Sequence, residues 1–355
     1  MAKCLRDLGH AMEFVAPLKI RDTIWLNSQR KLHRLFTGKR ILREREPLAL
    51  DDLARQVNRK LASINVDLVF CDSTLPLSHL ETKLPVVLWI DAVFAGMLGF
   101  YPSFQKISNR SIRNGNEAEQ LALEKTNLAF FTSGWSRQTC IENYVVDPNK
   151  LHVVMTGANL LGEPSANEVA AMIDSRPLEP CRLLFVGMDW ERKNGDAAVA
   201  LAGELNRHGL PTILTVIGKG PKKKWPDYVH FIGNLNKEKP YDQRTLSMFY
   251  AQSHFLLLPT RAEALGRVLM EATAYGVPCL VTDVGGTSSY IANNENGHLF
   301  PSDERFVPMA ADYIMDVFAS VDKYRNLARN AHSIYLTSGN WKVTGNKIQE
   351  LLSRL

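Results

Sequence analysis

The chain has 355 residues, of which 45% are hydrophobic and 22% are charged, and its formal net charge is +5. This length exceeds what one hydrophobic core usually supports, and the composition is that of an ordinary globular protein, so we expect two domains. The excess of positive charge is too small to indicate a nucleic-acid-binding protein. It suits a protein that handles phosphorylated ligands or visits an anionic membrane surface.

The cysteines are scattered, odd in number and without C-x-x-C spacing, which disfavours both a disulfide framework and a zinc site. They are Cys4, Cys71, Cys140, Cys181 and Cys279. Reduced thiols in the cytoplasm are the better interpretation. No apolar run approaches the roughly 20 residues that a transmembrane helix needs, so any membrane contact would be peripheral, at the inner face.

The first half of the chain opens with a predicted helix at Ala2–Leu8 and then holds short apolar runs separated by helical or loop-like segments. The predicted strands are Met12–Ala16, Asp67–Asp72, Pro85–Asp91, Leu128–Ser133 and Leu151–Thr156. An open α/β domain normally begins with a strand and a glycine-rich turn. Because both are absent here, we expect the N-terminal domain to lack its first strand, through a late start site, a fragment or a genuine loss.

The second half repeats the pattern. Its predicted strands are Arg182–Gly187, Thr212–Gly218, Val229–Gly233, His254–Thr260 and Pro278–Asp283. Continuous apolar strands that alternate with helices predict parallel sheets covered on both faces, hence an α/β protein of two Rossmann-like domains. The turn-rich sequences GEPS and RPLEP mark the boundary. The predicted divisions are an N-terminal domain at 1–165, a linker at 166–180, a C-terminal domain at 181–335 and a closing helix at 336–355.

The segment Pro259–Gly286 carries the most chemistry. A predicted strand ends at Pro259, the next loop holds Glu263, and a helix opens near Gly266, with Glu271 eight residues after Glu263. Free backbone N–H groups at a helix N-terminus form an anion site, and a glycine allows a ligand to approach the backbone. Two carboxylates at different depths suit the hydroxyls of a sugar and of a ribose. The alternative is an ordinary helix start with one exposed Glu.

This segment resembles the E-x7-E signature of retaining glycosyltransferases of the GT-B fold, in the group 1 or family 4 class. FVGMDWERKNG at Phe185–Gly195 is similar to the strand, glycine and basic loop that hold the donor pyrophosphate in that family. LTVIGKGP, VHFIGNL and NGHLFP follow in the family's order, and LGHAMEFVAP, TSGWSRQT and KLHVVMTGAN resemble its N-terminal landmarks. The resemblance therefore covers nearly the whole chain and implies two facing domains, with the final helix crossing back to the first.

The resemblance also implies roles for individual residues. Glu263 would hold the hydroxyls of the donor sugar and Glu271 those of the ribose, while Arg192 and Lys193, after Gly187, would neutralise the pyrophosphate. The nucleobase would lie beside the segment from Ile232 to Leu235, and the sugar and phosphates would meet the amides around the helix start, at Ala264, Leu265, Gly266, Arg267 and Val268. The alternative for Arg192 and Lys193 is solvated surface charge.

A helix N-terminus and preorganised cations can stabilise a departing diphosphate without a metal. We therefore expect no metal site and no cofactor, with Asp51 and Asp52 at the start of a helix rather than in a D-x-D site. Many relatives carry an Arg where this chain has Met188, and Arg192 is the candidate replacement.

On the acceptor side, Asp91 follows a predicted strand. It either orients or deprotonates the acceptor hydroxyl or caps the next helix, and the sequence favours neither. Ser133 is expected to cap a helix. The basic stretch Arg30–Arg45 is either a solvated helix face or a contact for anionic lipid or an anionic acceptor.

The sequence predicts a retaining, metal-independent glycosyltransferase that moves a sugar from a nucleotide-sugar donor to the hydroxyl of a glycan, lipid or small molecule. The donor base (UDP, GDP or ADP), the acceptor and the oligomeric state stay open. A GT-B epimerase or phosphorylase is an alternative enzyme, and a non-catalytic or truncated sugar-nucleotide-binding protein is the alternative of another class.

Overall fold

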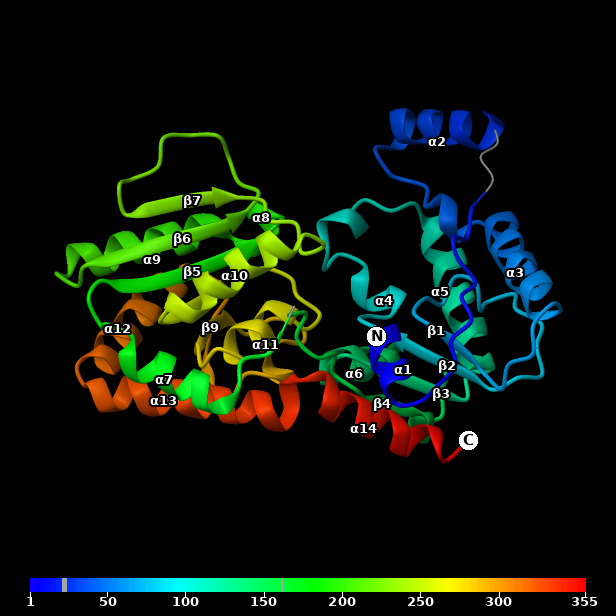
Figure 1. Ribbon diagram of the computed structural model, residues 1–355. Coiled ribbons are helices and arrows are strands. Elements are labelled where there is room, and N and C mark those ends of the chain that lie inside the picture. Colours follow the sequence, from blue (N-terminus) through cyan, green and yellow to red (C-terminus); the bar gives the residue numbers. More distant parts are fainter. Residues whose placement is uncertain (21–23, 161) are drawn as a thin grey trace. The chain divides into compact units, whose positions relative to one another are not determined.

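The computed structural model describes residues 1–20, 24–160 and 162–355, and these form two compact units. The first unit consists of Met1–Val154 with Lys347–Leu355, and the second of Met155–Asn346 (Figure 1). The division thus falls just before the predicted linker at 166–180. The predicted linker holds α7 (Ala166–Ser175), which begins with a capping box formed by Ser165 and Glu168.

The first unit holds a parallel sheet of four strands in the order β1-β2-β3-β4. The strands are β1 (Val69–Cys71), β2 (Val86–Ile90), β3 (Leu128–Phe131) and β4 (Leu151–Val153). All four were predicted as strands. Every residue of β2 and β3 is buried, as expected for strands covered on both faces.

The helices of the first unit lie between and around these strands. They are α1 (Ala2–Asp7), α2 (Ile24–Thr37), α3 (Pro47–Leu61), α4 (Phe94–Met97), α5 (Asn109–Lys125) and α6 (Gly134–Asn143), and α14 (Trp341–Leu352) ends in this unit. Ser133 caps α6 by accepting a hydrogen bond from the Ser136 amide, as predicted.

The second unit holds a six-stranded parallel sheet in the order β10-β9-β8-β5-β6-β7. The strands are β5 (Cys181–Gly187), β6 (Thr212–Gly218), β7 (Val229–Gly233), β8 (Phe255–Leu258), β9 (Cys279–Thr282) and β10 (Gly297–Phe300). Five were predicted, and β10 was not assigned as a strand. The order reverses between β5 and β8, and a ligand crevice in such a sheet lies outside the carboxyl ends of the strands at this point.

Alternate side chains of this sheet enter two separate cores. Phe185 and Leu257 face one core with α9 and α12, whereas Leu184 and Leu256 face the other with α10 and α11. The helices are α7, α8 (Trp190–Lys193), α9 (Gly195–Arg207), α10 (Pro240–Gln252), α11 (Arg267–Thr273), α12 (Phe306–Phe318) and α13 (Val321–Ile334). The predicted α/β class with two parallel sheets is therefore confirmed.

Two local predictions are wrong. Residues 12–16 are not a strand, because no neighbouring strand in the described residues pairs with them, and Phe14 is half exposed. Asp51 and Asp52 do not start a helix either. Helix α3 begins at Pro47, whose fixed backbone suits the first helical turn, so both aspartates lie inside the helix.

In the parts of the chain that the structure describes, no helix combines the length and apolar character needed to span a membrane.

Candidate active site

The carboxyl end of β5 leads into a short basic helix. After Gly187, the Asp189 side chain accepts a hydrogen bond from the Arg192 amide and starts α8, which ends at Asn194 in the left-handed conformation (φ 55°). The buried Trp190 ring anchors this turn, with its centroid 5.6 Å from that of Phe185. The loop is thus fixed with Arg192 and Lys193 in its last turn.

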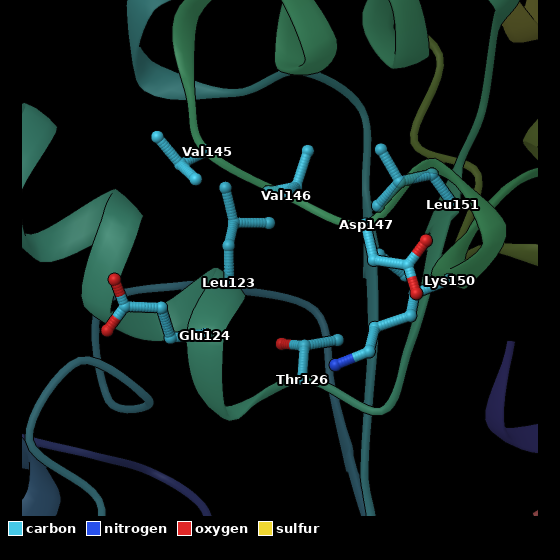
Figure 2. A pocket seen from close by; sticks show the side chains of 9 residues that line it. Leu123, Glu124, Thr126, Val145, Val146, Asp147, Lys150 and Leu151 are labelled. Carbon is cyan, nitrogen blue, oxygen red and sulfur yellow. The ribbon is translucent and has the colours of Figure 1, made fainter.

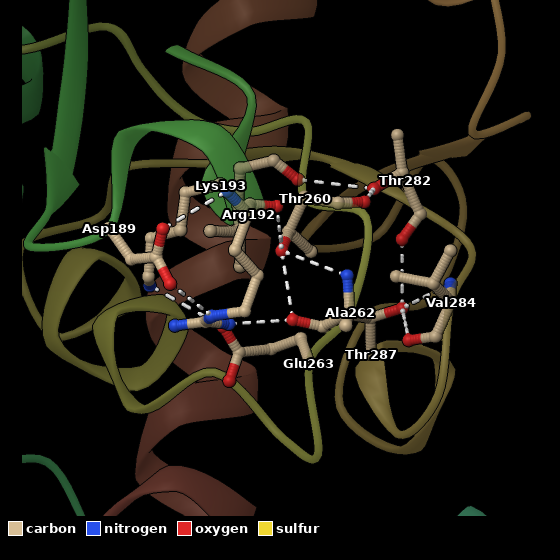
Figure 3. A network of polar contacts seen from close by, with 10 residues as sticks. Asp189, Arg192, Lys193, Thr260, Ala262, Glu263, Thr282, Val284 and Thr287 are labelled. Atoms are coloured by element: carbon tan, nitrogen blue, oxygen red, sulfur yellow. Dashed lines mark hydrogen bonds and ion pairs between the residues drawn. The ribbon is translucent and has the colours of Figure 1, made fainter. Parts of the chain in front are cut away.

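The neighbouring strand, β8, delivers Glu263 to the same place. The Arg192 Nη1 atom donates to the Ala262 carbonyl at 2.6 Å and lies 3.3 Å from Glu263 Oε2, while Lys193 Nζ lies 3.4 Å from the same oxygen (Figure 3). The three charged side chains are 12–18% exposed. The structure therefore brings Glu263 together with Arg192 and Lys193, which lie about 70 positions earlier in the sequence. Solvated surface charge does not describe these three predicted site residues.

A chain of threonine hydroxyls ties the surrounding loops together. Thr260 Oγ1 donates to the Arg192 carbonyl at 3.2 Å, Thr282 Oγ1 donates to the Thr260 carbonyl, and Thr287 Oγ1 donates to the Thr282 carbonyl at 2.9 Å (Figure 3). All three threonines are buried. Buried hydroxyls satisfied in this way hold the loops after β5, β8 and β9 in one arrangement.

Helix α11 begins beside these groups with backbone amides that find no acceptor in the described part of the chain. Gly266 precedes it with φ +87°, a conformation that side chains rarely adopt. Within the described residues, no backbone carbonyl or side chain accepts a hydrogen bond from the amides of Leu265, Gly266, Arg267 or Val268. These amides are the ones expected to meet an anion, and Ala264, before them, is buried.

Glu271 lies on α11, and its carboxylate is only 1% exposed. The Tyr250 hydroxyl donates to its Oε2 atom at 2.9 Å, and Lys237 Nζ lies 2.6 Å from the same atom. Burial, with the nearby carboxylate, raises the pKa of Tyr250 well above its usual range, so the hydroxyl keeps its proton and donates it. Sequence reasoning missed both partners of Glu271. The only signal for Lys237 was its place in the loop after a strand.

A cavity of about 530 Å³ opens beside this cluster. Its lining includes the predicted residues Gly187, Arg192, Lys193, Leu235 and Val268, together with Met188, Gly218, Asn234, Asn236 and Lys237. Of the described residues that line it, three carry a positive charge and none carries a carboxylate. Ile232 is 40% exposed and is not part of the lining. Arg192 and Lys193 pair with Glu263, and Lys237 pairs with Glu271, so these groups together hold three cations against two carboxylates. The volume and the remaining positive charge suit an anionic ligand of nucleotide size.

Asp91 belongs to the first unit, where it follows β2 and is exposed. It lines a cavity of about 420 Å³ with Asp72, Ser73, Tyr101 and Ser103, among others. It does not cap a helix, because α4 begins after Val93, so that alternative is wrong. The cavity lies at the carboxyl edge of the sheet, where α/β proteins place ligands.

A smaller cavity of about 220 Å³ lies at the opposite edge of the same sheet (Figure 2). Thr126 precedes β3 and Lys150 precedes β4, so its walls stand at the amino ends of the strands. The other labelled side chains include Leu123, Val145 and Val146, which are apolar. Because this edge of a parallel sheet seldom holds a site, we assign the cavity no role.

The family described as Glycosyl transferases group 1 matches residues 173–333, which hold the basic turn, both glutamates and the start of α11. The match covers less than half of the chain, and this part resembles a group 1 glycosyltransferase domain. The predicted recognition is thereby confirmed for the class, while the family 4 assignment stays a prediction.

Curated relatives include glycosyltransferases of two kinds. D-inositol 3-phosphate glycosyltransferase of Gordonia bronchialis is 24% identical over 271 residues, which are 70% of this chain and 58% of that protein. The glycogen synthase of Mycobacterium tuberculosis (strain H37Rv) is 27% identical over 162 residues, 42% of this chain and 37% of that one. The chain thus spans only about half the length of the curated relatives it matches.

Solved structures show the same fold. Sucrose-phosphate synthase from Thermosynechococcus elongatus superimposes with a TM-score of 0.67 at 19% identity, covering 86% of this chain and 78% of that one. Alr3699/HepE of Anabaena in complex with UDP gives a TM-score of 0.65 at 18% identity, covering 86% and 82%. The fold is therefore that of the GT-B glycosyltransferases.

Proposed function

We propose that this protein transfers a glycosyl group from a nucleotide sugar to an acceptor hydroxyl. The observation that carries the proposal is the cavity beside β5 and α11, which is walled by Arg192, Lys193 and Lys237 and adjoins open backbone amides. Such a wall complements the charge of a nucleoside diphosphate, which is both part of the donor and the leaving group.

The proposed roles follow from position. Arg192 and Lys193 balance the negative charge that develops on the diphosphate as the glycosidic bond breaks, and they hold Glu263 at the rim, where it accepts hydrogen bonds from the sugar hydroxyls. The amides from Leu265 to Val268 add donors for the sugar and the phosphates. Glu271 lies deeper and accepts from the ribose hydroxyls, and Leu235 borders the base.

The stereochemical course belongs to the proposal as well. Glu263, the carboxylate proposed to meet the donor sugar, is engaged by Arg192 and Lys193, and no carboxylate lines the donor cavity among the described residues. We therefore propose attack from the same face as the departing diphosphate, with retention at the anomeric carbon. The three cavity cations outnumber the two carboxylates, Glu263 and Glu271, with which they pair, and on that ground we propose that they offset the charge of the leaving group without a metal ion. We propose that Asp91 orients the acceptor hydroxyl or takes its proton.

The nucleotides bound in the structural neighbours indicate which donor base to test first. Structures of Anabaena Alr3699/HepE contain UDP, UDP with glucose, or UDP-glucose. UDP-sugars are therefore the first donors to test, ahead of GDP- and ADP-sugars. The acceptor is a hydroxyl of a glycan, a lipid or a small molecule. We also propose a cytoplasmic location, because the cysteines are scattered and lack the spacing of a disulfide framework, and a peripheral contact with an anionic membrane.

An assay of donor consumption tests the proposal. The wild-type protein and the variants Lys193→Ala and Glu271→Ala are incubated with UDP-, GDP- and ADP-sugars and a panel of acceptors, and the released nucleoside diphosphate is measured. We expect release in the wild type and a drop of about 100-fold or more in both variants. Wild-type rates in both variants would reject the site. Tight nucleotide binding without release or transfer would favour a non-catalytic binding protein.

A further inference from the structure

Helix α2 presents large apolar side chains to the outside of the first unit. Leu32, Leu35 and Phe36 are 54%, 78% and 81% exposed. Their spacing of three and four residues places them on one face of the helix. Figure 1 shows α2 at the periphery of this unit. A contiguous face of this kind, as opposed to a single exposed leucine, marks an interaction surface.

The surroundings of this face are strongly basic. Residues 24–43 contain Arg30, Lys31, Arg34, Lys39, Arg40 and Arg43 and no aspartate or glutamate. At 100° per residue, Arg30 and Arg34 lie on the side of α2 away from Leu32, while Lys31 flanks the apolar face. Arg34, Lys39 and Arg40 are exposed. The segment therefore combines an apolar face with a basic one. Its six positive charges exceed the formal net charge of the whole chain, which is +5.

We propose that this apolar face of α2 (Leu32, Leu35 and Phe36) docks on a bilayer of anionic lipid. A helix with an apolar face and a lysine- and arginine-rich polar face lies in the plane of the interface, with its apolar side chains among the acyl chains and its cations at the headgroups. The inference deepens the peripheral contact proposed above by naming the surface that makes it, and it stands independently of sugar transfer.

Charge decides between the bilayer and a second copy of the chain. Two α2 helices packed through this face would bring the Lys31 side chains that flank it toward one another, and no acidic residue of the segment is there to offset them. Three side chains are also fewer than the 20–30 residues per partner that a stable protein interface buries. An anionic bilayer removes both difficulties, because it attracts the cations and accepts the apolar side chains.

Vesicle flotation tests the proposal with the full chain. The protein is mixed with vesicles of phosphatidylcholine alone or with 30% phosphatidylglycerol, at low and high salt, and the floating fraction is measured. We expect flotation with the anionic vesicles only, reduced at least tenfold in Leu35→Ser/Phe36→Ser and in Lys31→Gln/Arg34→Gln. Val145→Ser is the matched control, since Val145 is an 86% exposed apolar side chain of the same unit outside α2. It should float as the wild type does.

Three results would overturn the proposal. These are no flotation of the wild type, equal flotation with neutral vesicles at any salt, or unchanged flotation of both double variants. A wild-type dimer in light scattering that Leu35→Ser/Phe36→Ser converts to a monomer, without vesicle binding, would assign the face to self-association instead. Thermal unfolding of the double variants should match that of the wild type, because the replaced side chains are exposed. Nucleoside diphosphate binding by the same variants shows whether the donor site is intact.

Discussion

The ammonium group of Lys237 lies within hydrogen-bonding distance of both carboxylate oxygens of Glu271, at 2.6 Å from Oε2. Lys237 is 39% exposed on the loop after β7, whereas Glu271 is buried on α11. The pair therefore ties the loop that borders the proposed base site to the helix that would hold the ribose. A ribose that reaches Glu271 must share this carboxylate with Lys237 or displace it.

Removal of Lys237 should destabilise the protein more than removal of a surface lysine. Among the described residues, Lys237→Met leaves the buried Glu271 carboxylate with Tyr250 as its remaining side-chain donor. We expect a loss of roughly 1–3 kcal/mol in the free energy of unfolding, moderated by the partial exposure of the lysine. Lys323→Met is the matched control, because its ion pair with Asp316 is solvent-exposed and should contribute less than about 1 kcal/mol. Equal losses in urea denaturation would contradict this account of the pair.

Lys193 should discriminate ligands by their phosphates. Lys193→Ala removes one of three cations from the cavity wall, so the affinity for a nucleoside diphosphate should fall about 10- to 100-fold while the affinity for the parent nucleoside changes little. Calorimetric titration measures both. The exposed Lys222 gives the control variant Lys222→Ala, which should bind both ligands as the wild type does. A uniform loss for nucleoside and diphosphate would point to misfolding of the cavity instead of a lost charge contact.

Gly218 should tolerate no side chain. It ends β6 with φ +132°, and a Cβ atom there would lie 1.7 Å from the Gly187 carbonyl oxygen, which is backbone and cannot move aside cheaply. We expect Gly218→Ala to cost more than about 2 kcal/mol of stability and to weaken nucleotide binding, because Gly187 and Gly218 both line the cavity. Gly162→Ala, where a Cβ meets nothing within 4 Å, should be close to neutral. Thermal unfolding of the two variants compares them directly.

His254 should make stability depend on pH in the acid range. It is fully buried, its Nδ1 atom accepts from the Arg182 amide at 2.8 Å, and burial, assisted by Arg176, lowers its pKa to about 3. Between that value and the usual pKa near 6.5, the unfolded chain binds a proton at this position that the folded chain does not. The free energy of unfolding therefore falls as pH decreases from about 7 toward 3, by up to roughly 4 kcal/mol.

The variant His254→Asn isolates this contribution. It should be less stable than the wild type at pH 7, since it loses packing against Phe318 and Tyr324, but its stability should decline less steeply with acid. His230→Asn, at an exposed position, controls for the substitution itself. Denaturation midpoints at pH 7, 6, 5 and 4 give the slopes. Parallel slopes for His254→Asn and the wild type would contradict the assignment.

Much of the fold could be predicted from local sequence patterns. Continuous apolar runs predicted nine of the described strands, because strands buried on both faces carry such runs wherever they occur. Met12–Ala16 has the same composition and is no strand, since pairing requires a neighbour that local sequence does not specify. In β10, His298 and Leu299 are only partly buried, and the weaker apolar signal hid the strand.

The site was predictable where it followed a motif and unpredictable where it depended on tertiary contacts. Glu263 and Arg192 were proposed from separate motifs, and the structure places them in contact. The partners of Glu271 come from a loop and from the interior of α10, where a lysine or a tyrosine has no distinctive sequence context. The threonine chain that fixes the loops is likewise a product of the fold. For Asp91 the sequence left two roles open, one on the acceptor hydroxyl and one as a helix cap. The start of α4 after Val93 excludes the cap.

We propose that the basic turn after β5 and the start of α11 form one diphosphate site. The most direct test is the thermal stabilisation of the wild-type chain and of Lys193→Ala by UDP, GDP and ADP, each compared with its nucleoside. The account predicts that at least one diphosphate raises the wild-type midpoint by several degrees, that its nucleoside does so much less, and that Lys193→Ala loses most of the difference. A wild-type midpoint that no nucleoside diphosphate shifts, even at millimolar concentration, would contradict it.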